Sequence, residues 1–532
     1  MKKRLLITEE LLTKSFLIIM AMIFLALSYY SFRYSYYEIN YETEKFMNYK
    51  DNLLLNVVGI LAGTALLIGL INIGKRLSDY TIKKVLFAVL IISTAFGFYW
   101  FSCHQWLPDA DQFNVHQIAS MVSQDDYGSF VKWGYAAVFQ QQWGLIYFLE
   151  ILYRVFGVAD YNIFIVINIL TIPVVIWCGY YIVCKISTNN NSVKLIYLTF
   201  LLYCIPLYGY IPQVYGEMVS VGALFVGSVL LLSLVEKFKI WKAVGLGTVV
   251  GYAVQVRQNS LIFVIALIGV LVFISIFRKK WSYFLTMCIC VVCLIGANAI
   301  VRGRYEPFAS EECVNMPSIL WVAMGLHDTQ EGPGWFDGSS TDVFMYQADF
   351  DLELTEQIAK DDIRASIENF LEHPDYTFDF LRRKILSQWN APMYQAFCAN
   401  FKNVKEEAHG LVRILYFDEG KILTENFMNI YQIAVYCGII CYCVWALKNK
   451  AKLECNVLLI TVFGGFLFSI MWEAKARYIF PYFMFSLSYA VIGLERVVCI
   501  GMKKIQGLKW KKKDDKVINK EHSCNSERTP IE

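Results

Sequence analysis

Charged side chains are scarce in this sequence: they make up 17% of its 532 residues, while 57% are hydrophobic. An ordinary soluble protein has about 25% charged and about 45–50% apolar residues, so this composition excludes a fold that faces water on all sides. The formal net charge is only +3, which gives no indication of nucleic acid as a partner. The chain is therefore expected to be an integral membrane protein.

Three further signals are missing. No small-residue cleavage site follows the first apolar stretch, residues 14–32, so it is expected to stay as a span rather than be removed as a signal peptide. No internal repeat of fixed period occurs, which gives no support to an inverted-repeat transporter. The fifteen cysteines fall mostly in apolar stretches. Only Cys103, Cys313 and Cys398 fall in expected outer loops, so one disulfide can form but not a disulfide framework.

Long apolar runs take the place of charge. A helix needs about twenty apolar residues to cross about 30 Å of hydrocarbon, and twelve runs suit this, which predicts an all-α polytopic membrane protein of about twelve transmembrane helices. The segment 143–157 is shorter and carries Glu150 and Arg154, so it is expected to be a half-embedded or interfacial helix. The twelve runs are 13–31, 53–74, 83–102, 161–184, 194–211, 217–236, 241–256, 259–277, 281–301, 429–448, 455–472 and 478–498.

The lysines and arginines of the short connections set the orientation. With twelve spans, the basic residues within 2–4, 75–84, 185–194, 237–242, 278–280, 448–452 and from 503 onward all fall on one side. Both termini of a multi-pass plasma-membrane protein are then expected to be cytoplasmic. The predicted units are N-terminal spans 1–102, a first outer loop 103–160 with amphipathic interfacial helices, a membrane core 161–301, a small extracytoplasmic subdomain 302–428, C-terminal spans 429–502 and a basic, disordered cytoplasmic tail 503–532.

Ionisable groups near a bilayer are costly and usually functional, and here they gather at the outer ends of the spans. In the first outer loop, Pro108 and Asp109 are expected to form a turn or helix cap. One apolar stripe follows, so Asp111 is expected to open a short amphipathic helix on the membrane surface. The residues of this predicted stripe are Phe113, Ile118, Ala119 and Val122.

Complementary groups occupy the other outer ends. They are Tyr215 and Glu217 before the sixth span, Arg257, Gln258 and Asn259 after the seventh, Arg382, Arg383, Lys384, Trp389 and Asn390 at the end of the long loop, and Glu473, Lys475 and Arg477 before the last span. Each has a structural alternative: Asp111 as a helix cap, Arg257 as an interface anchor, the Glu473–Arg477 group as an ion pair and residues 382–384 as a solvated face. These alternatives do not explain why all the groups fall on one side.

Metal ligands are present in the first outer loop but fit no known spacing. His104, Asp109, Asp111 and His116 supply suitable atoms within one loop. No metal or other cofactor is expected to be required, and a divalent cation is kept as an alternative.

The order of these features resembles the polytopic lipid-dependent glycosyltransferases of the C superfamily (GT-C), particularly the bacterial relatives of protein O-mannosyltransferases. The matching pieces, from about residue 80 to 490, are PDADQF, QQQWGLIYFLEILYRVFG, YGEM, the turn 257–259, WVAMGLHDTQEGPGWFDG, KILSQWNAP and EAKARYIFP. The last piece looks like the Glu-x-x-x-Arg-Tyr-x-x-Pro close of these enzymes. The sequence departs from the family at Phe139 and Gln140, where relatives carry Pro-His, and it offers two acids, Asp109 and Asp111, at the catalytic position.

The resemblance implies an enzyme that transfers a sugar from a polyprenyl-phosphate donor to a glycan, lipid or protein acceptor on the outer face, with inversion at the anomeric carbon. Asp111 is the expected base, because relatives place the acid just before Gln and the helix, and Asp109 is the alternative. Arg257 is expected to hold the donor phosphate, followed by Arg477 and Lys384. The expected substrate-positioning residues are Gln258, Asn259, Tyr215, Glu217, Glu473 and Trp389.

Two other functions stay open. A transporter or flippase of a lipid-linked saccharide would share the basic outer groove but need no catalytic carboxylate. A polysaccharide polymerase or ligase would also use outer arginines.

Overall fold

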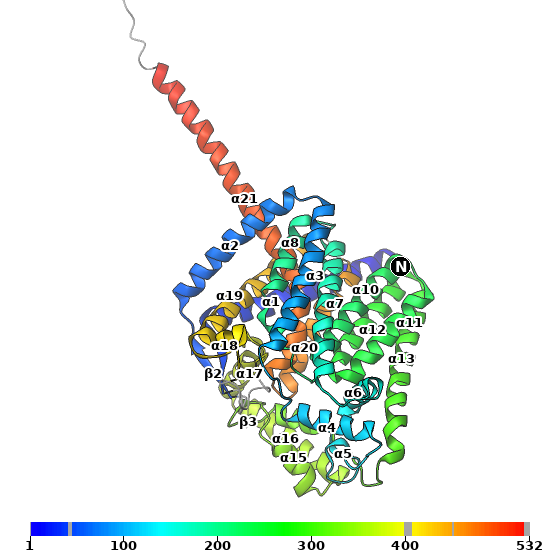
Figure 1. The fold of residues 1–532 in the computed structure, drawn as a ribbon. Helices are drawn as coiled ribbons and strands as arrows, with labels where there is room; N and C mark the ends of the chain where they lie inside the picture. Colours follow the sequence, from blue (N-terminus) through cyan, green and yellow to red (C-terminus); the bar gives the residue numbers. More distant parts are fainter. Residues whose placement is uncertain (1, 41–44, 398–406, 450–451, 526–532) are drawn as a thin grey trace, which may run out of the picture.

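The computed structural model describes residues 2–40, 45–397, 407–449 and 452–525, and these residues are mostly helical (Figure 1). Ten helices among them are long and apolar enough to cross a membrane, some only together with an adjoining short helical turn. They confirm a multi-pass, all-α membrane fold. The ten are α1 (Lys2–Arg33), α2 (Leu53–Arg76), α3 (Asp79–Ser102), α7 (Asn162–Ile186), α10 (Glu217–Glu236), α12 (Leu261–Arg278), α13 (Trp281–Tyr305), α19 (Asp418–Asn449), α20 (Val457–Met471) and α21 (Phe480–Asn525).

Two of the twelve predicted spans are shorter than expected. The run 194–211 is broken into α8 (Asn191–Leu202) and α9 (Ile205–Gly209), because Pro206 has no amide hydrogen to donate to the carbonyl of Leu202 and its ring disfavours a continuous helix through that turn. The run 241–256 forms α11 (Ile240–Val256), whose 17 residues rise about 26 Å. The twelve α8 residues rise only about 18 Å, so α8 alone does not span the hydrocarbon.

The segment 143–157 forms α6 (Trp143–Phe156), whose 14 residues rise about 21 Å, less than a full span. Its charges are neutralised inside the protein. The buried Glu150 carboxylate accepts hydrogen bonds from Arg154 Nε at 2.9 Å, Arg304 Nη2 at 2.6 Å and the Tyr305 hydroxyl at 2.8 Å. The length of α6 agrees with a helix that does not cross the bilayer.

The helix α4 (Asp111–Ser123) begins at Asp111, as the sequence predicts. The predicted stripe is wrong at one position: Phe113 is exposed, and Val115 is buried with Ile118 and Val122. The spacing 115, 118, 119, 122 keeps one helical face, whereas residue 113 lies about 140° away from 118. With α5 (Tyr135–Val138) and α6, α4 lies at the end of the bundle opposite to the end that α21 leaves (Figure 1).

The long region before α19 contains several short elements. A small hydrophobic cluster that includes Leu320, Phe344 and Phe350 joins some of them to Val138, in the predicted first outer loop. They are α14 (Ile319–Gly325), the strands β3 (Asp328–Thr329) and β4 (Gly332–Pro333), α15 (Ser339–Asp342), α16 (Leu352–Glu372), α17 (Pro374–Trp389) and α18 (Gly410–Tyr416). Short helical turns of other types are η1 (Gln140–Gln142), η2 (Gln258–Ser260), η3 (Glu306–Phe308), η4 (Val343–Gln347), η5 (Leu453–Asn456) and η6 (Ala476–Ile479).

A β-hairpin between α1 and α2 was not expected. Its strands are β1 (Tyr34–Asn40) and β2 (Lys45–Lys50), and the Tyr36 amide donates to the carbonyl of Asn390 at 3.1 Å, which fixes the hairpin on the segment after α17. At the other end of the chain, α21 continues to Asn525, where the sequence predicts a disordered tail. Lysine and glutamate are good helix formers, so a polar segment can extend a helix.

The cysteines with described side chains are buried or half-buried. Cys103 and Cys313 are both free. Cys398 lies outside the described residues, so a disulfide that involves it stays a prediction.

Candidate active site

Two arginines from distant parts of the chain meet at two tyrosine rings. The guanidinium carbon of Arg477 lies 4.3 Å from the ring centre of Tyr215, and that of Arg257 lies 5.8 Å from it. Both guanidinium groups also approach Tyr478, at 5.8 Å and 5.4 Å. These four residues form the arginine–tyrosine cluster. Cation–π contacts stabilise guanidinium groups that have lost part of their water.

The backbone brings the two halves of this cluster together through one glycine. Gly216, between Tyr215 and α10, has φ 85°, a conformation that side chains rarely adopt. A Cβ atom there would lie 2.7 Å from Val256 Cγ1 and 2.8 Å from the Val256 carbonyl oxygen. Tyr215 can therefore lie beside Arg257 because residue 216 is glycine.

Acidic side chains balance the cluster. Arg257 Nη2 lies 2.8 Å from Glu217 Oε1, and Glu217 is only 2% exposed. The Tyr478 hydroxyl donates to Glu473 Oε2 at 2.7 Å. A buried charge is tolerated when it is paired, so Glu217 holds the Arg257 side chain in place. Both predicted acids contact the cluster itself.

Asp111, in the predicted first outer loop, lies near the arginine–tyrosine cluster. The fully buried side chain of Gln112, the next residue, accepts a hydrogen bond from the Val214 amide at 2.6 Å. The Tyr135 side chain, in α5, hydrogen-bonds the Asp111 carboxylate. The charge of Arg477 also acts on Tyr135. Burial, together with the Asp111 charge, raises the pKa of Tyr135 well above its usual range. Asp111, Tyr135, Tyr215 and Arg477 are thus close neighbours.

The turn before α4 constrains Asp111. Ala110 has φ 50° and ψ −129°, and no side chain caps the helix there. Asp109 Oδ1 accepts the Ala110 amide at 2.8 Å, so this carboxylate closes the turn. Such strained residues persist only where the surroundings hold them, and they are frequent at functional sites. Asp111 is the first residue of α4, and the N-cap position is occupied by Ala110.

Buried amides hold the Arg477 side of the cluster. Gln395 Oε1 accepts the Arg477 amide at 3.0 Å, and Gln213 Nε2 donates to the Gln395 carbonyl at 3.0 Å. Asn168, in the span α7, donates to the carbonyls of Ile211 and Gln213 at 2.9 and 3.0 Å. This network fixes the loop before Tyr215 to the membrane helices.

Four other predicted residues lie apart from the cluster or at its margin. Next to Arg257, Gln258 is exposed and Asn259 is half-buried. The Trp389 indole is buried, and its nitrogen donates to Ser469 Oγ at 3.0 Å. Lys384 is also fully buried, and its ammonium donates to the carbonyls of Gly325 and Ile470. Trp389 and Lys384 therefore hold α17 against α20.

The metal hypothesis has no geometric support among the described residues, where no group of three His, Cys, Asp or Glu side chains is placed to hold an ion. His116 Nδ1 lies 2.8 Å from the Tyr153 hydroxyl. His104 instead interacts electrostatically with Glu407 and His409. The two histidines therefore have separate surroundings.

Several residues of the site escaped prediction. Tyr135 sits in a four-residue helix with no sequence pattern, and Gln395 lies in an irregular loop. Gln112 lies in PDADQF and Tyr478 in EAKARYIFP, two pieces that carry the family resemblance. They could therefore have been predicted from the candidate residues directly beside them.

Comparisons with known proteins identify no family. No family model matches the chain, and no curated protein matches it. Among solved structures, it is similar to the archaeal oligosaccharyltransferase AglB from Archaeoglobus fulgidus, solved with an inhibitory peptide and a dolichol-phosphate. The identity is 12%, the TM-score is 0.39, and the match covers 81% of this chain. The chain spans about half of that protein, 52% of its length. The functional argument therefore rests on the geometry described above.

Replacing Gly216 by alanine should destabilise the protein. We expect the free energy of unfolding to fall by about 2–4 kcal/mol, because the new Cβ meets Val256 and φ is unfavourable. Thermal unfolding in detergent measures this. Gly269→Ala is the matched control, since nothing lies within 4 Å of that position, and it should not lower the unfolding temperature. Equal unfolding temperatures for the two variants would contradict the close approach at Gly216.

Lys384 should make stability depend on pH. Burial lowers the pKa of Lys384 to about 7, against the smaller opposing effect of Glu473. Between about pH 7 and the ordinary lysine pKa of about 10.4, the unfolded chain binds the proton more strongly, so stability from this group rises with pH. The unfolding temperature of the wild type, relative to Lys384→Met, should therefore increase from pH 7 to pH 10. A constant difference across this range would contradict the burial of the ammonium group.

Proposed function

We propose that the protein is a membrane glycosyltransferase that moves a sugar from a polyprenyl-phosphate donor to an acceptor hydroxyl on the outer face of the plasma membrane. One observation carries the proposal. The guanidinium groups of residues 257 and 477 meet at Tyr215, and the carboxylate of residue 111 and the Arg477 guanidinium both act on Tyr135, although these residues are far apart in the sequence. Glycosyl transfer from a phosphate leaving group requires a base and cations together.

Asp111 is the proposed base. The acceptor oxygen attacks the anomeric carbon while its proton passes to the Asp111 carboxylate, and the bond between the anomeric carbon and the phosphate oxygen breaks. The leaving polyprenyl phosphate takes the electron pair. Base assistance of this kind contributes on the order of 10²–10⁴ in rate. The Tyr135 hydroxyl, which hydrogen-bonds Asp111, would keep the carboxylate oriented.

Arg257 and Arg477 are the proposed ligands of the leaving phosphate. Guanidinium groups hold phosphate by charge-assisted and bidentate hydrogen bonds, which a lysine provides less well. Arg257 has Glu217 as its present ion-pair partner, so phosphate binding would require the Arg257 guanidinium to contact both anions. Glu473 and Tyr478 would position the second guanidinium group.

The lipid part of the donor fits a site at the end of a helix bundle. The cluster joins the ends of α10, α11 and the apolar first part of α21. A polyprenyl chain can lie along such helices while its phosphate and sugar remain at the interface. A flippase or a polysaccharide polymerase could use the same arginines, so Asp111 is the residue that separates these functions.

Replacing Asp111 by asparagine should lower transfer from a purified polyprenyl-phosphate sugar by at least about 100-fold. Binding of the donor should change little, because the arginines are retained. Asp109→Asn tests the alternative acid, and Asp361→Asn, on the exposed face of α16, is the matched control. A transferase that keeps full activity in Asp111→Asn would contradict the assignment. Unchanged movement of a lipid-linked saccharide across the membrane, with no transfer in any variant, would favour the flippase.

The anomeric configuration of the product should be inverted. A single displacement with one carboxylate forms no covalent sugar–enzyme intermediate, so the new bond forms on the face opposite to the leaving phosphate. Proton NMR of the product, compared with the donor, measures this configuration. Retention of configuration would contradict the single-displacement mechanism.

A further inference from the structure

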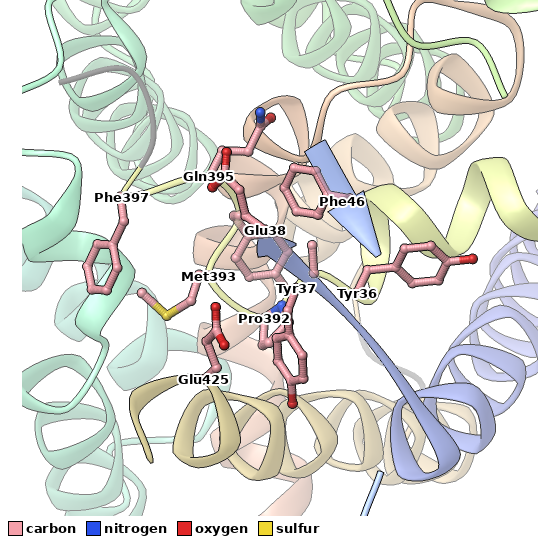
Figure 2. A pocket seen from close by; sticks show the side chains of 11 residues that line it. Tyr36, Tyr37, Glu38, Phe46, Pro392, Met393, Gln395, Phe397 and Glu425 are labelled. Atoms are coloured by element: carbon pink, nitrogen blue, oxygen red, sulfur yellow. The ribbon is translucent and has the colours of Figure 1, made fainter. Parts of the chain in front are cut away.

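A second pocket lies beside the hairpin and next to the arginine–tyrosine cluster. Its cavity volume is about 220 Å³, compared with about 10 Å³ for the pocket in Figure 2, with which it shares Tyr36 and Phe46. The residues that line the larger one, here the hairpin pocket, are Tyr36, Phe46, Asn48, Glu331, Gly332, Pro333, Trp335, Arg382, Arg383 and Ser387.

We propose that the hairpin pocket binds a saccharide portion of the acceptor, an inference that rests on the proposed glycosyltransferase function. The hairpin presents one face to it. Tyr36 pairs with Asn48 and Glu38 with Phe46 across the strands, so these side chains share a face. Figure 2 shows Tyr36 directed away from Met393 and Glu425 of the smaller pocket. Tyr36 and Phe46 line both pockets, so the two cavities adjoin along this face of the hairpin.

Aromatic rings form one wall of the hairpin pocket. The ring centres of Phe46 and Trp335 are 5.0 Å apart with an angle of 36° between the planes. The Trp335 nitrogen donates to Ser387 Oγ at 3.1 Å, which fixes the indole. Rigid aromatic walls with polar tips suit the apolar faces and the hydroxyl rims of sugar rings.

The charges in the pocket favour a neutral, polyhydroxylated ligand over an anion. Arg382 is paired with Asp379 at 2.5 Å, and Arg383 with Asp379 and Asp328 at 2.7 and 2.6 Å. Phosphate would have to displace these carboxylates. Each guanidinium has five N–H donors, so some remain for hydroxyl oxygens even when a carboxylate is bound.

Glu331 supplies the complementary acceptor. Its Oε2 atom is buried and has no hydrogen-bond partner among the described residues. A buried acceptor without a donor is unfavourable, and a ligand hydroxyl would satisfy it. Asn48, opposite on the hairpin, offers both a donor and an acceptor. A lining that accepts from and donates to hydroxyl groups, beside aromatic rings, is the chemistry of a saccharide site.

The pocket adjoins the segment that carries Arg477. Lys475 Nζ lies 5.4 Å from the ring centre of Trp335, and the Ala474 amide donates to the Gly334 carbonyl at 2.7 Å. The Trp335 ring therefore lies between the hairpin pocket and the loop of Glu473 and Arg477. A glycan held in the pocket would be anchored next to the proposed reaction site.

The test is binding of oligosaccharides to the full-length protein in nanodiscs. The probes are fluorescent neutral hexose and N-acetylhexosamine oligomers of two to six units, with labelled hexapeptides as the comparison. At least one oligosaccharide should bind, with its Kd raised about tenfold in Glu331→Gln and at least threefold in Asn48→Ala. Glu353→Gln, an exposed acid on α16, is the matched control and should bind like the wild type.

Three results would overturn the inference. The first is that no oligosaccharide binds at millimolar concentration, and the second is that the Kd is unchanged in both pocket variants. The third is that only the peptides bind in a Glu331-dependent manner. Because binding is measured without transfer, Asp111→Asn should bind the oligosaccharide like the wild type. Absence of transfer with intact, Glu331-dependent saccharide binding would overturn the transferase function alone. Transfer to a non-saccharide acceptor with no saccharide binding would overturn this inference alone.

Discussion

Two guanidinium groups at one end of a membrane helix bundle must be paired, and this requirement organises that end of the structure. Arg257 and Arg477 share the rings of Tyr215 and Tyr478 and are balanced by Glu217 and Glu473. Poor hydration near lipid makes unpaired charge costly, so the segments that carry these residues are drawn together. The cluster is therefore both a structural junction and a site where an added anion would find cations already assembled.

The loops around this junction are held by short polar contacts rather than by a large core. Gln112 ties α4 to Val214, and Asn168 and Gln213 tie the same loop to α7 and to Gln395. Gly216 permits the close approach to Val256. These contacts fix Asp111 beside Tyr135 without any contribution from Asp111 to capping its helix. A carboxylate held in a fixed position suits the proton transfer proposed for Asp111.

Hydropathy predicted the membrane helices well because a spanning helix must be long and apolar. It failed for the run 194–211, where Pro206 interrupts the helix. The shared side and the family resemblance predicted one site for Asp111, Arg257 and Arg477, and this assignment stays a prediction, although Arg257 and Arg477 do meet at Tyr215. The hairpin was not, because YSYYEIN and KFMNYK are short and follow a long helix directly. Lys384 looks like a phosphate ligand in sequence, and only the packed structure shows its two carbonyl partners. Tyr135 depends on tertiary contacts that no local pattern encodes.

The central claim is that Arg257, Arg477 and Asp111 form one site for a lipid phosphate and its sugar. A cryo-EM structure of the protein in nanodiscs with a bound polyprenyl monophosphate tests this most directly. Phosphate density should contact both guanidinium groups, with the Asp111 carboxylate and Tyr135 nearby. Phosphate density at the opposite end of the bundle, where α21 leaves it, would contradict the account.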